Sequence, residues 1–155
     1  MGSGKTLVGA LAAQRANAQF FDLDHMVEDK AGMSIAEIFA THSEEAFRAF
    51  EKETLTSVLQ PDSVVALGGG VVLDDDNWRL ISSRAVTVFL DVPFETIWDR
   101  IRNLPGRPLI TSRTESEVRA LYDSRRTRYE EAMHSVDGTQ PAGAMADEVL
   151  KLWFA

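Results

Sequence analysis

The chain contains no cysteine among its 155 residues. This absence excludes disulfide bonds, thiol catalysis and zinc sites built on cysteine. The sequence also lacks any apolar run near the roughly 20 residues that a membrane-spanning helix needs. No apolar core followed by a cleavage site is found near Met1. These absences are compatible with a cytoplasmic protein, and that is the location we expect.

Basic residues are in the minority, with 16 Lys and Arg against 24 Asp and Glu, which gives a net charge of −8. Such a charge repels nucleic acid and anionic membranes, so we expect neither as a partner. An anionic substrate would have to be held by a few local Arg and Lys residues. The length predicts a single domain over residues 1–155 with a real hydrophobic core, and we expect it to act as a monomer on small molecules.

Short apolar runs alternate with longer helical stretches, which predicts an α/β fold with a mainly parallel sheet. Strands are expected over Gln19–Leu23, Val64–Leu67, Ala85–Leu90 and His134–Asp137. Helices are expected over Thr6–Ala16, Ser34–Ala40, Ser43–Leu59, Asp74–Ser83, Pro93–Arg102, Thr114–Met133 and Pro141–Phe154. The segment 103–113 has two prolines and no periodicity, so it is interpreted as a loop.

The run Gly2-Ser3-Gly4-Lys5-Thr6, followed by a helix, is typical of the closing half of a phosphate-binding loop. In such a loop, glycine backbone N–H groups surround phosphate oxygens, the lysine reaches the β- and γ-phosphates, and the threonine hydroxyl binds Mg²⁺. The first glycine of the full pattern, and the strand before it, would lie upstream of Met1. By itself the run could equally be a flexible N-terminal tag or an ordinary helix start.

Two carboxylates, Asp22 and Asp24, lie at the carboxyl end of the first expected strand. Alternate residues of a strand point to the same side, so both should share one face. One could orient Mg²⁺ and the other could accept a proton from a substrate hydroxyl. The alternative is a solvated turn after the strand.

Arg48 has Glu44 four residues before it and Glu51 three residues after it on the same expected helix. This spacing fits either a surface salt-bridge ladder or a guanidinium that Glu51 holds ready to grip a carboxylate. The glycine run 68–70 follows a buried strand. Three consecutive glycines are costly to order, which indicates that a ligand approaches the backbone closely.

Several further arginines are candidates for binding anions. Arg107 lies in the expected loop and could close over a transferred phosphoryl group, or could simply be exposed. Arg125, Arg126 and Arg128 precede Tyr129 on one expected helix. They cannot all face one ligand, so at least one is a candidate anion clamp and the others are surface charges.

Taken in order, these pieces resemble the shikimate kinase family over essentially the whole chain. The matching segments are G-S-G-K-T (2–6), F-D-L-D-x-x-V-E (21–28), S-I-A-E-I-F (34–39), F-R-x-x-E (47–51), L-G-G-G (67–70), R-P-L (107–109), R-x-x-x-Y (125–129) and V-D (136–137). The resemblance implies a three-layer P-loop kinase fold of the nucleoside-monophosphate-kinase type, with a central parallel sheet in the order 2-3-1-4-5. It also implies ATP-dependent phosphorylation of the 3-hydroxyl of shikimate, in aromatic amino-acid biosynthesis.

The resemblance further assigns roles to single residues. The catalytic residues would be Lys5, Asp24 and Arg107, the last within a lid at about residues 103–113. ATP would be bound by Gly2, Ser3, Gly4, Lys5, Thr6, Leu7 and Arg107, and Mg²⁺ by Thr6 and Asp22. Shikimate would be bound by Asp24, Arg48, Gly68, Gly69, Gly70 and Arg125.

The first strand of the family, and the first glycine of its phosphate loop, have no counterpart in this sequence. That strand would lie in the sheet interior, between the strands at Val64 and Val86, so its loss leaves two inner edges unpaired. We therefore expect either a shortened form of a longer protein or a chain of low stability. Three alternatives stay open: a gluconate-type kinase of the same fold, a non-catalytic nucleotide-binding domain, and a structural fragment without a ligand.

Overall fold

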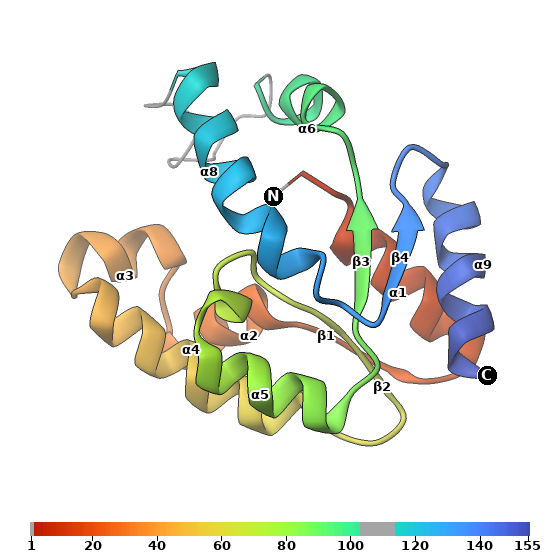
Figure 1. Ribbon diagram of the computed structural model, residues 1–155. Coiled ribbons are helices and arrows are strands. Elements are labelled where there is room, and N and C mark those ends of the chain that lie inside the picture. Colours follow the sequence, from red (N-terminus) through yellow and green to blue (C-terminus); the bar gives the residue numbers. More distant parts are fainter. Residues whose placement is uncertain (1, 103–113) are drawn as a thin grey trace.

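The computed structural model describes residues 2–102 and 114–155 (Figure 1). These residues form an α/β fold in which four short parallel strands alternate with helices, as the sequence predicted. The strands are β1 (Gln19–Asp22), β2 (Ser63–Ala66), β3 (Val88–Asp91) and β4 (His134–Asp137). None of the described helices is both long enough and apolar enough to cross a membrane.

The helices largely follow the predicted ones. They are α1 (Lys5–Ala16), α2 (Leu23–Ala31), α3 (Ile35–Thr41), α4 (Glu44–Val58), the 3₁₀ helix η1 (Val71–Leu73), α5 (Asp75–Arg84), α6 (Phe94–Ile101), α8 (Glu115–Tyr129) and α9 (Ala142–Trp153). The predicted capping boxes are present at the starts of α3 and α8. Helix α8 ends at Tyr129 rather than continuing to Met133.

The strands pair in two separate parallel sheets. Strand β1 pairs with β2, with Gln19 opposite Ser63, and β3 pairs with β4, with Val88 opposite His134. Within the described residues, β2 and β3 are not paired with each other. The single central sheet that we expected is therefore divided, and the division falls where the sequence predicted two unpaired inner edges.

The sequence analysis missed the 3₁₀ helix η1 and the α-helix α2, and the presence of α2 corrects an expectation about the two carboxylates. Strand β1 ends at Asp22, whose side chain caps the next helix by accepting a hydrogen bond from the Asp24 N–H at 3.1 Å. Aspartate is a preferred N-cap because it satisfies one of the free N–H groups of the first turn. Asp24 therefore lies in the first turn of α2, and the prediction that both carboxylates alternate along one strand is wrong.

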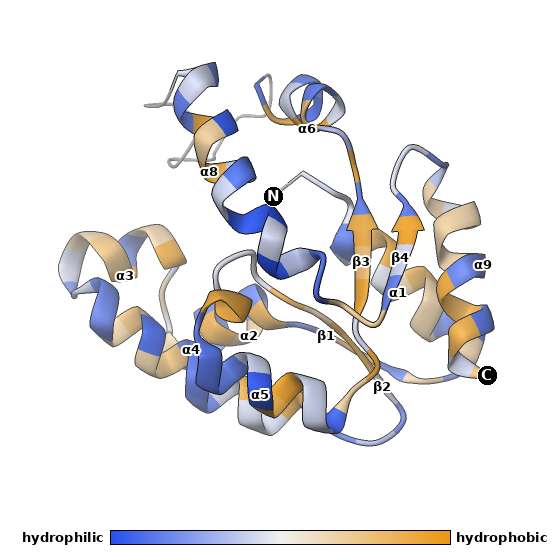
Figure 2. Ribbon diagram, viewed as in Figure 1, coloured by the Kyte–Doolittle hydropathy of each residue, from blue (hydrophilic) through white to orange (hydrophobic). Residues whose placement is uncertain are grey.

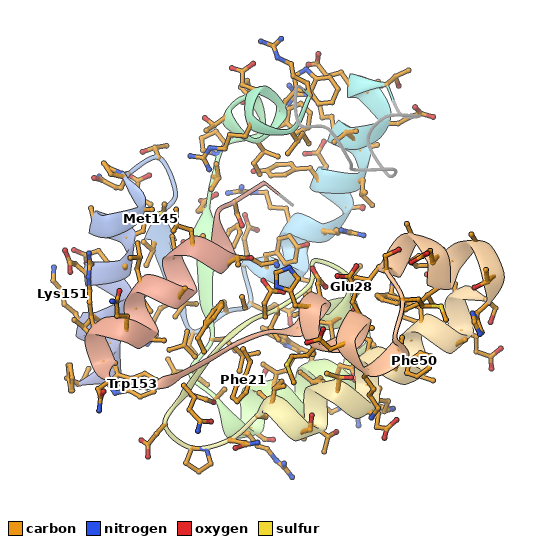
Figure 3. The ribbon with its side chains drawn as sticks, turned by 180° about the vertical axis from the view of Figure 1, so that it is seen from behind. Phe21, Glu28, Phe50, Met145, Lys151 and Trp153 are labelled. Carbon is orange, nitrogen blue, oxygen red and sulfur yellow. The ribbon has the colours of Figure 1, made fainter. Side chains whose placement is uncertain are left out.

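Apolar side chains hold the layers together in several separate clusters. Behind the strands, α1 and α9 pack against each other through a cluster of Val8, Ala12, Val136, Met145 and Ala146. Figure 3 shows α1 crossing the strands with α9 and its Met145 beside it. Helices α4 and α5 pack with η1 through a different cluster, which contains Leu23, Leu55, Val58, Val71, Val72 and Ile81.

Candidate active site

The amino-terminal end of α1 is built to receive an anion. Its N-cap, Gly4, has a left-handed φ of 88°, no side chain caps the helix, and its first turn holds no acidic residue. In contrast, a side chain caps each of α2, α3, α4, α5 and α8. The first N–H groups of α1 therefore stay available at the positive end of its dipole, where a phosphate group binds favourably.

Lys5 and Thr6, in the first turn of α1, meet the two carboxylates predicted for the site. The Thr6 hydroxyl donates a hydrogen bond to Asp22 Oδ2 at 2.5 Å. The Lys5 ammonium nitrogen lies 3.7 Å from Asp22 Oδ2 and 3.5 Å from Asp24 Oδ2. Although Asp24 lies on a helix rather than a strand, the structure brings both carboxylates to the phosphate loop.

The ionised form of Asp22 is favoured by its surroundings. Burial of this carboxyl would raise its pKa, but the Thr6 hydrogen bond and the positive charges of Lys5 and His25 outweigh burial, so the pKa of Asp22 is lowered. A carboxylate and a hydroxyl in contact are hard oxygen ligands of the kind that Mg²⁺ prefers. Among the described residues, no three Asp, Glu, His or Cys side chains come together in a metal-binding cluster.

The lowered pKa of Asp22 predicts how stability depends on pH. The pKa of Asp22 in the folded chain is below the unfolded value of about 3.9. The stabilisation that the ionised Asp22 gives the fold is therefore present above that value and is lost as the pH falls through the folded pKa. We expect the free energy of unfolding to decline less steeply below about pH 4 in Asp22→Asn, whose amide oxygen can still cap α2. Urea unfolding of both proteins between about pH 3 and 6 measures this. Parallel pH profiles for the two proteins would contradict the prediction.

Arg48 is held by a buried carboxylate, as the second interpretation of its spacing proposed. Its Nη1 lies 2.7 Å from Glu51 Oε2, whereas the pair with the exposed Glu44 is longer, at 3.4 Å. Glu51 is only 2% exposed. Burial, opposed by the positive charge of Arg48 and reinforced by the negative charge of Asp24, raises the pKa of Glu51. The guanidinium of Arg48 is therefore fixed from one side and keeps donors for another anion.

The glycine run brings these groups together. A Cβ at Gly68 would lie 2.5 Å from Asp24 Oδ1, and one at Gly70 would lie 2.9 Å from Arg48 Nη1. The Tyr129 hydroxyl donates a hydrogen bond to the Gly69 carbonyl at 2.7 Å, which attaches α8 to the same loop. The glycines therefore make room for side chains of the site itself, and the sequence pattern did not reveal this contact with Tyr129.

The structure separates the three arginines of α8. Arg126 forms two hydrogen bonds with the Asp91 carboxylate, at 2.8 and 3.0 Å, and Arg128 pairs with Asp75 and Glu131. Arg125 lines a cavity of about 590 Å³ together with Lys5, Gly68 and Gly69. Its Nε is buried and finds no hydrogen-bond partner in residues 2–102 and 114–155. Arg125 is thus the member of this group that faces the site.

Two of the predicted positions, Leu7 and Arg107, remain predictions. Arg107 and the expected lid at 103–113 lie outside the described residues. Leu7 is described and is 57% exposed in the first turn of α1, which leaves it accessible to a nucleotide. The remaining groups form an anion-binding helix end with a lysine, a pair of carboxylates, and two arginines able to hold a second anion.

Comparisons with known proteins give matches over nearly the whole chain. A family model described as Shikimate kinase matches residues 1–153. The chain is 35% identical over 151 residues to a shikimate kinase of Aquifex aeolicus, a match that covers 97% of this chain and 89% of the relative. It is 38% identical over 154 residues to a shikimate kinase of Ruegeria pomeroyi, covering 97% of this chain and 79% of the relative.

A solved structure is also similar. The shikimate kinase of Acinetobacter baumannii, solved in complex with shikimate, superposes with a TM-score of 0.92 at 32% sequence identity. The match covers 99% of this chain and 88% of that chain.

Proposed function

Since the chain belongs to the shikimate kinase family and is a shikimate kinase, we propose which of its residues carry the reaction. The terminal phosphates of ATP bind at the N-terminus of α1, on Gly2 to Leu7. Shikimate binds with its carboxylate between Arg48 and Arg125, and its 3-hydroxyl faces Asp24. The observation that supports this most directly is the contact of Asp24 with Lys5 at 3.5 Å, because it joins the substrate side to the phosphate side.

In this proposal, the oxygen of the shikimate 3-hydroxyl bonds to the γ-phosphorus of ATP while Asp24 accepts the hydroxyl proton. The bond between the γ-phosphorus and the β,γ-bridging oxygen breaks, and ADP leaves with that oxygen. Lys5 and the N–H groups of α1 offset negative charge on the phosphates. Phosphoryl transfer depends mainly on positioning and on electrostatic stabilisation, and the described residues supply both. Arg107, from the segment outside the described residues, would add a further positive charge.

Thr6 and Asp22 are the residues that would hold Mg²⁺ together with phosphate oxygens. Their oxygens are 2.5 Å apart, and the ionised form of Asp22 is favoured. A bound Mg²⁺ would neutralise phosphate charge. For the fold, we propose that β1 to β4 correspond to strands 2, 3, 4 and 5 of the family's order 2-3-1-4-5.

The test measures the release of ADP from MgATP by the 155-residue chain, with shikimate as the substrate in one assay and gluconate in a parallel assay. The paired arginines and the Asp24 contact predict turnover with shikimate and less than about 1% of that rate with gluconate, because differential transition-state binding sets the ratio. Comparable rates would favour a gluconate-type kinase. ATP binding without turnover of either compound would favour a non-catalytic nucleotide-binding domain.

Glu51 is a positioning residue, because it acts through Arg48. We expect Glu51→Gln to raise the KM for shikimate about 10-fold with little change in kcat, since the amide holds the guanidinium less firmly. The matched control is Glu44→Gln, which changes the other carboxylate on the same arginine and should alter KM less than about twofold. Steady-state kinetics at saturating MgATP measures both. Equal effects of the two substitutions would contradict the role of Glu51.

A further inference from the structure

The glycine run 68–70 is a short loop in close contact with two side chains of the site. A Cβ at Gly68 would meet the Asp24 carboxylate, and one at Gly70 would meet the Arg48 guanidinium. A displacement of the loop backbone would therefore move atoms against both side chains. Whatever holds the loop in place also bears on the positions of Asp24 and Arg48.

The three carbonyl groups of the loop are held in two different ways. The carbonyls of Gly68 and Gly70 each accept a hydrogen bond from the backbone N–H three residues further along, at 3.4 and 3.1 Å. These two bonds are local. The Gly69 carbonyl instead accepts the hydrogen bond from Tyr129, which lies 60 positions away along the chain. The Tyr129 hydroxyl therefore connects the middle of the loop to a distant part of the fold.

The second half of α8, which carries Arg125, is attached to the rest of the fold mainly by polar contacts. Figure 2 shows that this half of the helix is hydrophilic, and the buried Val118 lies in the other half. Arg126 and Arg128 pair with carboxylates of β3 and α5, and Tyr129 reaches the glycine loop. The placement of Arg125 relative to the loop therefore depends on hydrogen bonds and ion pairs.

The ring of Tyr129 is itself fixed by packing. It lies against the apolar cluster that joins α4, α5 and η1, and its centroid is 5.7 Å from that of the Phe89 ring. Burial raises the pKa of Tyr129, and the positive charge of Arg125 and a hydrogen bond from its side chain oppose that rise without cancelling it. The phenol thus keeps its proton at neutral pH. A protonated phenol can donate to one group and accept from another, so it can serve Gly69 and Arg125 together.

We propose that Tyr129 is a positioning residue for shikimate, whose hydroxyl joins Arg125 to the glycine loop and so sets its distance from Asp24 and Arg48. Asp24 and Arg48 touch the loop directly, whereas Arg125 is linked to it through Tyr129. Groups that are already spaced for a ligand need less ordering when it binds. The inference rests on the proposed function, because it takes Arg125 as a ligand of the shikimate carboxylate.

The test is Tyr129→Phe, which keeps the ring and its packing and removes the hydroxyl. We expect the KM for shikimate to rise about 10-fold, because the Gly69 carbonyl loses its partner and Arg125 is no longer joined to the loop. The kcat and the KM for MgATP should change less than about threefold, since the phosphate-binding groups lie on α1. Steady-state kinetics with the whole 155-residue chain measures all three values.

The matched control is Tyr122→Phe. Tyr122 is the other of the two tyrosines in the chain, lies on the same helix, and also donates to a backbone carbonyl, that of Val92, at 3.0 Å. Val92 follows β3 and is not part of the glycine loop. We therefore expect Tyr122→Phe to change the KM for shikimate less than about twofold. Circular dichroism checks that both variants are folded.

A double-mutant cycle tests whether Tyr129 acts through Arg125. In the parent enzyme, Tyr129→Phe should lower kcat/KM for shikimate about 10-fold. In an Arg125→Met background the same substitution should lower it less than about threefold, because the group that the hydroxyl positions is already absent. Residues that act through one another show non-additive effects of this kind.

The possible failures are distinguishable. If Arg125→Met leaves kcat/KM for shikimate unchanged, the proposed carboxylate site is wrong and the inference is wrong with it. If Arg125→Met has a large effect but Tyr129→Phe has no more effect than Tyr122→Phe, the inference alone is overturned. Equal effects of Tyr129→Phe with and without Arg125 would also overturn it, since the two residues would then act independently.

Discussion

Replacing Asp24 by asparagine is expected to lower kcat for shikimate phosphorylation by about 1,000-fold, near the middle of the range for losing a general base. Asparagine has nearly the same shape, so it still fits against Gly68, where the space is so limited that a Cβ on the glycine would lie 2.5 Å from Asp24 Oδ1. It cannot accept the hydroxyl proton. Since ATP is proposed to bind mainly at the start of α1, the KM for ATP should change less than about threefold.

The control for this experiment is Asp29→Asn, which removes the same charge from an exposed position on the same helix. It should leave kcat and both KM values within about twofold. Single-turnover measurements with enzyme in excess show whether the chemical step itself is slowed. If kcat for Asp24→Asn stays within about 10-fold of the parent and only the KM for shikimate rises, Asp24 binds the substrate without serving as the base.

The second large effect is expected on substituting either of the two arginines that we propose bind the shikimate carboxylate. We expect Arg125→Met and Arg48→Met each to lower kcat/KM for shikimate by about 100- to 1,000-fold, mainly through KM. Removing one partner of a hydrogen-bonded charge pair in a desolvated site has an effect of this size. Methionine keeps the apolar stem of the side chain, so packing is largely retained.

An analogue of shikimate in which the carboxylate is replaced by a hydroxymethyl group makes this test specific. The parent enzyme should discriminate strongly against the analogue, because the analogue lacks the carboxylate that the arginines bind. Each arginine variant should lose most of that discrimination, because it lacks one of the guanidinium groups that distinguish the two compounds. The matched control is Arg79→Met, whose side chain is 76% exposed on α5 and pairs with Asp76. Variants that bind shikimate weakly but discriminate as well as the parent would show that the arginines act on the fold rather than on the carboxylate.

The sequence by itself determined the α/β class, the positions of the strands and most helices, and the family. These follow from local rules: apolar periodicity, capping residues such as Ser34 and Thr114, and the compact phosphate-loop run, each of which acts over a few residues. The family resemblance also implied that the strands at Val64 and Val86 would have unpaired inner edges, and among the described residues the strands do form two separate pairs.

Only the tertiary structure decided which side chains meet. The sequence placed Asp24 on a strand, yet it lies on α2, because the Asp22 side chain caps that helix and ends the strand. Arg125, Arg126 and Arg128 could not be ranked from their spacing. They are distinguished by Asp91 and Asp75, which lie at least 34 positions away along the chain and reach α8 only after folding. Long-range pairs of this kind depend on how helices and strands pack against one another, and local sequence patterns do not determine that packing.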